Sequence, residues 1–434
     1  MTELSDDQAD VVDQLRDHGR ARVTGLAGAG KTTVALQLPE LLGWREDQVV
    51  YAAPTNRALR VLARKAPDRT LRTKTVHQLL YGPPSEKHCS ACPVHASTEG
   101  QCHGPSPWCV CGELDVADSS RRYLADAGAH VVIDEASMTR KDDYEEIMEQ
   151  AGSVRNLIFV GDPGQLPPVD NANPGWQALT TEDDRLPVHT LTGIHRQAEG
   201  SEIIQLAHAV RHAPAGAVGP ALLPDMPFRR GVRIVPASAG AWWQAVALRS
   251  GTGADGHPKM GHTALLGYSN RSRVQACLDA RRAIFGDIAL TYPVLPGELV
   301  RARVRYSDRV LANEELGQVV AIDPSTSTDL WTMADVMDES GRVLPSQRLV
   351  HPELWGTSIY GKHDQGFLDM LPEKEAKKAE KEPRWLYGYG LTVHASQGGE
   401  WRNVIYRLGP GSTREEVYTA ITRARELCVI VLPG

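Results

Sequence analysis

The chain lacks the features expected of a membrane protein, a secreted protein or a strongly basic nucleic-acid-binding protein. Among its 434 residues no apolar run approaches the roughly 20 residues that a membrane helix requires, so we expect no membrane association. The N-terminal segment MTELSDDQADVVDQL has neither a basic start nor an apolar stretch, which predicts a cytoplasmic protein without a secretory signal. The formal charge of −7 gives no evidence for nucleic acid but leaves a local basic groove open. Aromatic residues make up only 6%, which disfavours a long base-stacking platform.

Cysteine is scarce outside one short segment. Five of the seven cysteines lie between Cys89 and Cys111, whereas Cys277 and Cys428 stand alone in apolar stretches. We expect the two isolated cysteines to be small core residues. In a chain with no export signal, the cluster suggests a metal site rather than a disulfide framework.

The sequence as a whole has the composition of a globular protein, with 41% hydrophobic and 23% charged residues. Short apolar runs alternate with helical patterns, which predicts an α/β fold of two similar domains, each with a parallel sheet covered by helices on both faces. Strands are expected at 21–24, 48–53, 130–133, 156–160, 189–194, 263–268, 391–394, 404–408 and 428–432. Helices are expected at 4–18, 31–42, 56–65, 196–211, 271–285 and 413–425.

The stretch from Gly297 to about Leu386 breaks this rhythm. Short β-like pieces at 298–304, 318–322 and 342–349 are joined by polar turns, and a run of mixed charge follows at 373–384. This pattern predicts a small antiparallel barrel inserted in the second α/β domain. The predicted domains are therefore 1–80 with 113–187, a cysteine-rich insert at 81–112, 188–296 with 387–434, and the barrel at 297–386.

The first expected strand is followed by Gly25-Leu-Ala-Gly-Ala-Gly-Lys31-Thr32 and then by a helix, the context in which G-x-x-x-x-G-K-[ST] binds phosphate. Glycines let backbone N–H groups turn toward phosphate oxygens, and the helix N-terminus adds a favourable dipole. Lys31 is expected to reach the β- and γ-phosphates, and the Thr32 hydroxyl to bind Mg²⁺. The predicted nucleotide-binding residues here are Gly28, Ala29, Gly30, Lys31, Thr32 and Thr33.

An acidic motif, Val131-Val-Ile-Asp134-Glu135, lies downstream of the phosphate loop. Its apolar run predicts a buried strand that carries Asp134 to the edge of the same cleft, where the carboxylate can hold Mg²⁺. Glu135 can then orient and deprotonate the attacking water. Together the two motifs predict hydrolysis of ATP with Mg²⁺.

Further motifs accompany this pair in a regular order: 54–56 (PTN), 75–77 (TVH), 161–169 (GDPGQLPPV), 195–197 (HRQ), 391–400 (LTVHASQGGE) and 418–425 (YTAITRAR). In order and spacing they resemble the motifs of superfamily-1 helicases of the RecD/Dda type, and the resemblance covers nearly the whole chain. It implies two RecA-like P-loop domains and 5′ to 3′ movement on single-stranded DNA. If cationic fingers come from the second domain, hydrolysis requires closure of the two domains, and the cycle moves a strand across them.

The resemblance also implies roles for individual residues. Gln8 would read the adenine edge, Glu400 would touch the ribose, and Gln165 would sense the γ-phosphate or the attacking water. Arg196 and Arg423 would be arginine fingers, each contributing on the order of 10³–10⁵ in rate. Contacts with the single strand are implied for residues of three motifs: Pro54, Thr55, Asn56, Thr75, His77, Thr392 and His394.

Two inserted segments are also compared with this family. The stretch that contains 313–319 (NEELGQV) resembles the small barrel of Src-homology-3 type in the second domain of such helicases. The cysteine-rich insert occupies the position of the family's pin or wedge, which splits the duplex, but it departs from the usual pattern. We hypothesise that it braces the strand-separating element, with Trp108 either as a stacking residue or as local packing.

A metal would explain the cysteine spacing. A C-x-x-C pair and a C-x-C pair can each hold one side of a tetrahedral ion, and a buried Zn²⁺ could replace the core that so short a segment lacks. An iron–sulfur cluster and reduced, unliganded thiols are the alternatives. The favoured zinc ligands are Cys89, Cys92, Cys109 and Cys111, with Cys102 or His95 as substitutes.

The sequence therefore predicts a monomeric ATP-dependent DNA helicase that acts on single-stranded and forked duplex DNA, alongside proteins of replication, recombination or repair. One alternative is a translocase on RNA, or one that displaces proteins with little unwinding. Another is a non-catalytic nucleic-acid-binding module with a metal knuckle. The presence of Lys31, Asp134, Glu135 and Arg423 argues against this last alternative, because a relic site would be expected to have lost some of them.

Overall fold

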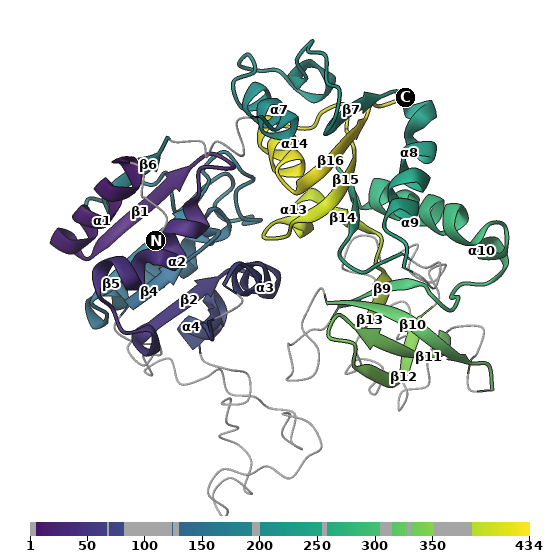
Figure 1. Ribbon diagram of the computed structural model, residues 1–434, viewed down its shortest axis with the longest axis horizontal. Helices are drawn as coiled ribbons and strands as arrows, with labels where there is room; N and C mark the ends of the chain where they lie inside the picture. Colours follow the sequence, from purple (N-terminus) through teal and green to yellow (C-terminus); the bar gives the residue numbers. More distant parts are fainter. Residues whose placement is uncertain are drawn as a thin grey trace, which may run out of the picture. The chain divides into compact units, whose positions relative to one another are not determined.

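The structure is a computed structural model that describes residues 6–66, 69–81, 124, 130–192, 200–253, 258–303, 315–325, 327, 331–350 and 384–434. The chain divides into two compact units, Met1–Pro163 with Pro167–His195, and Gly164–Leu166 with Arg196–Gly434. Figure 1 follows the chain from the first unit, in purple and blue, into the second, in teal, green and yellow. Over the described ranges, none of the helices has both the length and the apolar character of a membrane span.

A six-stranded parallel sheet, in the order β3-β2-β4-β5-β1-β6, forms the centre of the first unit. Its strands are β1 (Arg20–Gly25), β2 (Val49–Ala53), β3 (Arg72–Thr75), β4 (His130–Ile133), β5 (Asn156–Gly161) and β6 (Val188–Leu191). Strands β2 and β4 are buried along their whole length, as expected for parallel strands covered on both faces. The helices of this unit are α1 (Asp6–His18), α2 (Lys31–Leu42), α3 (Asn56–Lys65), α4 (Val76–Tyr81) and α5 (Lys141–Gln150), with short 3-10 turns η1 (Glu46–Gln48), η3 (Ala136–Met138) and η4 (Ala151–Ser153).

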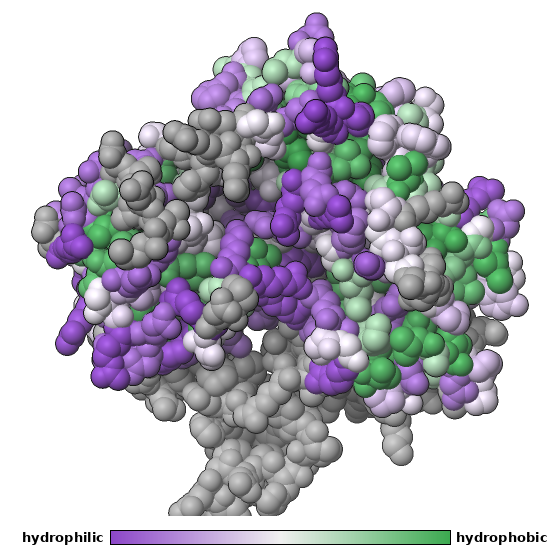
Figure 2. All heavy atoms as spheres, in the orientation of Figure 1, coloured by the Kyte–Doolittle hydropathy of each residue, from purple (hydrophilic) through white to green (hydrophobic). Residues whose placement is uncertain are grey.

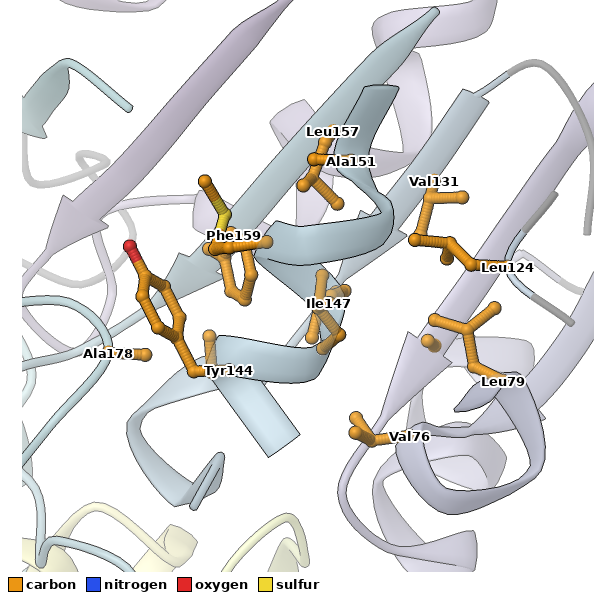
Figure 3. Close-up of a cluster of buried hydrophobic side chains, with 14 of the residues drawn as sticks. Val76, Leu79, Leu124, Val131, Tyr144, Ile147, Ala151, Leu157, Phe159 and Ala178 are labelled. Carbon is orange, nitrogen blue, oxygen red and sulfur yellow. The ribbon is translucent and has the colours of Figure 1, made fainter. Parts of the chain in front are cut away.

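Successive residues of the inner strands enter two different hydrophobic cores. On one face, residues of β4 and β5 pack with helices α4 and α5 (Figure 3): Leu79, Val131, Ile147, Leu157 and Phe159. On the other face, the alternate residues of the same strands pack with α1, α2 and α3: Leu15, Leu38, Leu62, Val132 and Ile158. This alternation fixes the register of the sheet, because a shift of one residue would exchange the two sets of side chains.

The second unit contains a five-stranded parallel sheet in the order β14-β8-β15-β16-β7. Its strands are β7 (Val232–Val235), β8 (Thr263–Gly267), β14 (Gly390–Thr392), β15 (Trp401–Arg407) and β16 (Ala424–Val431). The helices are α7 (Glu202–Arg211), α8 (Ala237–Ser250), α9 (Asn270–Phe285), α10 (Ile288–Thr291), α13 (Val393–Ser396) and α14 (Arg414–Ile421), with the 3-10 turn η5 (Gly219–Leu222). Side-chain caps begin several of them; for example, Ser269 accepts the backbone N–H of Ser272 at the start of α9.

A five-stranded antiparallel sheet, in the order β12-β11-β10-β9-β13, is inserted between α10 and β14 of the second unit. It consists of β9 (Leu299–Arg303), β10 (Leu316–Asp323), β11 (Trp331–Asp338), β12 (Val343–Val350) and β13 (Arg384–Tyr387). Its own small core includes Val319, Val336 and Trp385. Figure 2 shows hydrophobic side chains on the surface over α10 and over this sheet. In the α10 region, Ile288 and Tyr292 are half-exposed.

The structure confirms the α/β class with two parallel sheets, and it also contains the separate antiparallel sheet β9–β13. Helices α2 and α3 have the predicted bounds to the residue. The phosphate loop thus lies, as predicted, between a buried strand and a helix.

The structure corrects three assignments. The strand predicted at 189–194 for the second domain is β6, which pairs with β1, so the first unit runs to His195 rather than to 187. The strand predicted at 391–394 ends at Thr392, whose side chain caps α13. The helix predicted at 413–425 ends at Ile421, because Ala424 begins β16. In addition, the sequence predicts none of the following elements: β3, α4, α5, β7, α8, α10, β11 and β13.

Candidate nucleotide-binding site

The candidate residues of the first unit gather at one edge of its sheet. Because all six strands run parallel, their carboxyl ends meet at the same edge. The phosphate loop follows β1, residues 54–56 follow β2, Asp134 follows β4 and Asp162 follows β5. Open α/β sheets bind ligands at this edge, so the position suits a nucleotide.

The phosphate loop depends on glycine for its backbone conformation. Gly28 and Gly30 have φ values of 84° and 76°, which L side chains rarely adopt. Between them, Ala29 is buried in the core, and its N–H donates to the carbonyl of Leu26 at 3.2 Å. Gly30 then begins α2 in the left-handed conformation. The loop therefore turns sharply enough to direct the N-terminus of α2 toward a bound phosphate.

The ammonium group of Lys31 lies over this loop. Its Nζ donates to the carbonyl oxygens of Gly25 at 2.7 Å and Leu26 at 2.8 Å. The carboxylate of Asp162, fully buried after β5, is 3.9 Å from the same nitrogen. These contacts hold the ammonium group at the edge where phosphate oxygens would bind.

Thr32 and Asp134 bring two oxygen ligands together. The Thr32 hydroxyl donates to Asp134 Oδ2 at 3.4 Å, and Asp134 Oδ1 accepts the backbone N–H of Glu135 at 2.9 Å. Burial, reinforced by the charge of Glu135, raises the pKa of Asp134 to about 6, although the charges of Lys65 and Lys31 offset part of the rise. A hydroxyl beside a buried carboxylate whose charged form is disfavoured fits a Mg²⁺ ion, which prefers oxygen ligands.

Glu135 has an unusual backbone conformation. Its φ of 53° makes it, with Ser346, one of two non-glycine residues at positive φ in the described part of the chain. Such a conformation costs on the order of 1–3 kcal/mol and persists where the surroundings enforce it. Gly161 of β5 contributes to this enforcement, because a Cβ there would lie 3.1 Å from the backbone nitrogen of Ala136 and 2.8 Å from Leu179 Cδ1. The strain at Glu135 agrees with a catalytic position.

The start of α1 lies at the same edge. Asp7 Oδ2 accepts the backbone N–H of Thr192, just after β6, at 2.6 Å. The next residue, Gln8, is buried. The structure therefore brings the predicted adenine-reading residue to the edge that carries the phosphate loop.

The predicted strand-binding residues of the first unit begin two helices. Thr55 accepts the backbone N–H of Ala58 at 3.2 Å and caps α3, where Pro54 and Asn56 flank it. Thr75 and Gln78 form a reciprocal cap at α4, with bonds of 3.1 Å and 2.9 Å between side chain and backbone. His77 is exposed, and its ring centroid lies 4.8 Å from that of Tyr81. The caps give both threonines a structural role that does not depend on DNA.

The second unit contains the remaining described candidates. Thr392 caps α13 by accepting the N–H of Ala395 at 3.3 Å, and His394 is exposed on that helix. Glu400 is exposed just before β15. Arg423, just before β16, is buried, and its guanidinium donates to the carbonyl oxygens of Thr419 and Gly399, each at 3.2 Å.

The segment Gly164–Leu166 belongs to the second unit, so Gln165 is grouped there and not with Lys31. Leu166 is held on both sides, because its N–H donates to Thr419 Oγ1 at 2.9 Å and its carbonyl accepts from Gln397 Nε2 at 2.7 Å. Sequence analysis assigns no role to Gln397 or to Asp162. Both lie in quoted motifs, and that membership is the signal that could have identified them.

Several predicted residues lie outside the part of the chain that the structure describes. These are the finger Arg196, the cysteine-rich insert with its predicted ligands, and Trp108. Among the residues that are described, no group of three or more histidine, cysteine or acidic side chains could hold a metal ion. Cys277 and Cys428 are buried free thiols, as predicted.

Comparison with known proteins now identifies the family. The AAA domain family matches residues 3–221, and the UvrD-like helicase C-terminal domain matches residues 384–431. The chain belongs to the AAA-domain family, and its curated relative agrees with the resemblance to superfamily-1 helicases of the RecD/Dda type. The chain is 28% identical over 436 residues to the ATP-dependent RecD2 DNA helicase of Deinococcus radiodurans, and the match covers 98% of the chain. It spans only 48% of that relative's length.

Solved helicase structures share the fold. The Pif1 helicase from Bacteroides, in complex with ADP-AlF3 and single-stranded DNA, is 17% identical with a TM-score of 0.54, and the match covers 100% of this chain and 95% of that chain. The Pif1 helicase from Candida albicans is 15% identical with a TM-score of 0.50, covering 100% and 96%. At these identities the likeness shows the fold alone.

Proposed function

We propose that this chain is an ATP-dependent DNA helicase that couples hydrolysis to 5′ to 3′ movement on single-stranded DNA and to duplex unwinding. The meeting of Lys31, Thr32 and Asp134 at one sheet edge is the observation that carries the proposal. The RecD2 relative, described as an ATP-dependent DNA helicase, supports the activity, and the Bacteroides Pif1 structure with single-stranded DNA supports the substrate. Since the chain spans about half of the length of the RecD2 relative, the activity and the substrate are both part of the proposal.

In the proposed reaction, the first unit binds the triphosphate through backbone N–H groups of the phosphate loop and through Lys31. Phosphoryl transfer requires mainly positioning and charge compensation from the protein. Thr32 and Asp134 would hold Mg²⁺, which supplies further positive charge at the phosphates when bound. Glu135 orients the attacking water and accepts its proton at a side-chain oxygen.

The other predicted residues complete this proposal. Gln8 contacts the adenine and Glu400 the ribose, Gln165 senses the γ-phosphate, and Arg196 and Arg423 act as fingers. The single strand is contacted by residues 54–56, Thr75, His77, Thr392 and His394. Two features support a strand-contacting role beyond capping: the exposure of His77 and His394, and the position of both helix starts directly after carboxyl ends of parallel strands.

Two inserts and the setting of the protein belong to the same proposal. We propose that the antiparallel sheet β9–β13 is a small barrel of Src-homology-3 type, supported by its five antiparallel strands and its own core. We also propose that the cysteine-rich segment holds Zn²⁺ and braces the element that separates strands. Metal analysis of the purified protein tests this proposal. Zinc at one equivalent is expected, and the absence of both zinc and iron would refute it. By analogy with the family, the protein would act as a monomer in the cytoplasm on forked DNA, with replication or recombination proteins as partners.

The primary test is ATP hydrolysis with and without single-stranded DNA. Wild-type protein is expected to show hydrolysis that single-stranded DNA stimulates, and Lys31→Ala is expected to reduce it to background. Lys141→Ala is the matched control, because that exposed lysine lies on α5 with its ammonium 3.7 Å from Glu145. Hydrolysis that persists in Lys31→Ala would refute the assignment of the site.

The nature of the polynucleotide requires a second comparison. Stimulation by DNA homopolymers that exceeds stimulation by RNA homopolymers is expected. Stronger stimulation by RNA would favour an RNA translocase. Strong stimulation by DNA without strand separation on forked duplexes would favour a motor that displaces proteins.

A further inference from the structure

A buried polar network lies where the inserted antiparallel sheet joins the second parallel sheet, and the proposed reaction does not use it. It consists of Arg281 on α9, Glu298 just before β9, and Tyr389 between β13 and β14. These side chains belong to residues that are 3%, 0% and 1% exposed. Charged residues are almost never buried so completely without a partner.

The network satisfies the carboxylate of Glu298 from two directions. Arg281 Nε lies 2.9 Å and 3.0 Å from the two carboxylate oxygens. The Tyr389 hydroxyl donates to Glu298 Oε1 at 3.1 Å and accepts the backbone N–H of Leu299 at 3.2 Å. The carboxylate therefore links α9, the entry into the insert and the exit from it.

The remaining donors of Arg281 contact the connection that leads into the insert. Nη1 donates to the carbonyl of Ala289 in α10 at 3.0 Å, and Nη2 donates to the carbonyl of Tyr292 at 2.8 Å. The guanidinium carbon also lies 4.5 Å from the ring centroid of Tyr387, the last residue of β13. A single side chain thus contacts every segment by which the chain enters and leaves the antiparallel sheet.

Strands β9 and β13 belong to both bodies that they connect. Leu299 and Tyr387 pack in the core of the parallel sheet with α9, whereas Val300 and Trp385 pack in the core of the insert. Figure 1 shows these two strands between the parallel sheet and β10–β12. Between them the backbones approach closely, because a Cβ at Gly388 would lie 2.9 Å from the carbonyl oxygen of Val300. The residues that enter the inserted sheet at β9 and those that leave it at β13 are therefore both packed against the second parallel sheet.

We propose that Arg281, Glu298 and Tyr389 are positioning residues that hold the inserted sheet in one fixed orientation on the second parallel sheet, so that movement of that sheet is transmitted to the insert. In a buried pair, removal of one partner leaves the other charge uncompensated, so only the docked geometry satisfies both groups. The fixed attachment of the inserted sheet is inferred from the contacts at the junction and does not depend on the proposed function. Its effect on unwinding rests on the proposed helicase function.

The test compares Glu298→Gln with Asp287→Asn. Asp287 pairs with Arg282, the neighbour of Arg281, at 3.3 Å, but both of those side chains are exposed. Hydrogen exchange of the full chain reports on opening of the junction through the amides of Leu265, Leu299 and Gly388, which bond across it. Glu298→Gln is expected to accelerate exchange at these amides on the order of 100-fold, while Asp287→Asn leaves it unchanged. Equal exchange in both variants would overturn the proposal.

Function provides a separate readout. In Glu298→Gln we expect fewer base pairs unwound per ATP at unchanged kcat and KM for DNA-stimulated hydrolysis, because the network lies in the second unit and none of its three residues takes part in the proposed reaction. Tyr389→Phe, which removes only the hydroxyl, should give a smaller loss in the same direction and serves if Glu298→Gln does not fold. A parallel loss of hydrolysis and unwinding would overturn transmission. If the wild type neither hydrolyses ATP nor unwinds, the proposed function fails instead, and the exchange experiment alone decides the attachment.

Discussion

Asp134 provides the sharpest quantitative prediction. Its carboxylate is buried beside Glu135, and its pKa is raised to about 6 from an ordinary value of 3.8. The folded state therefore disfavours the charged form. In metal-free, nucleotide-free protein, Asp134→Asn should increase stability, because asparagine retains an oxygen that can accept the Glu135 N–H but carries no charge.

The magnitude follows from the two pKa values. At pH 7 their difference corresponds to about 3 kcal/mol of destabilisation by the charged side chain. Because the folded-state pKa is the higher one, the favourable contribution exists only below pH 3.8 and is lost as the pH rises through about 6. At pH 5 the expected gain from Asp134→Asn is about half as large.

Hydrogen exchange of peptides that cover β4 and β5, in EDTA and without nucleotide, measures this gain within the first unit. Slower exchange is expected in Asp134→Asn, by an amount that shrinks from pH 7 to pH 5 after correction for the intrinsic rate. Asp142→Asn is the control, because that carboxylate is exposed on α5. A loss of stability, or a gain that does not depend on pH, would refute the reasoning.

Three further predictions concern single residues. Arg423→Lys should lower kcat for ATP by on the order of 10³ with little change in nucleotide binding, whereas Arg425→Lys, exposed two residues later, should not; equal rates in steady-state assays would count against the finger. Gly161→Ala places a Cβ 2.8 Å from Leu179 Cδ1, so thermal unfolding should show a loss of about 1–3 kcal/mol; unchanged stability would contradict this crowding. Burial lowers the pKa of His130 from its ordinary 6.5, so its contribution to stability is complete above that pH and lost below it. The stability of His130→Gln, measured by denaturation, should therefore depend less on acid pH than that of the wild type. An identical pH profile would show that His130 does not cause this dependence.

Sequence alone is sufficient where the determinants are local. The bounds of α2 and α3 are predicted to the residue because Gly30 and Gly43 flank one helix in left-handed conformations and Thr55 caps the other. The position of Asp134 follows from the apolar run before it. These features depend on neighbours in the chain, which a sequence displays directly.

Features that depend on distant partners are not predicted. The apolar pattern of β6 indicates a strand but not that its partner is β1, since parallel pairing joins residues far apart in sequence. Strand β11 is not predicted because two of its buried positions, Thr332 and Asp338, are polar and interrupt the apolar alternation that indicates a strand. Arginine and glutamate are usually exposed on the surface, so the sequence gives no sign that Arg281 and Glu298 are buried. Only the fold shows that they are buried together.

The most direct test of the account is unwinding of a duplex that carries one single-stranded tail, followed by stopped-flow fluorescence with ATP and Mg²⁺. The account predicts strand separation from a 5′ tail, none from a 3′ tail, and none from either tail with Lys31→Ala. Unwinding by the Lys31→Ala protein, or unwinding by the wild type from the 3′ tail alone, would contradict it.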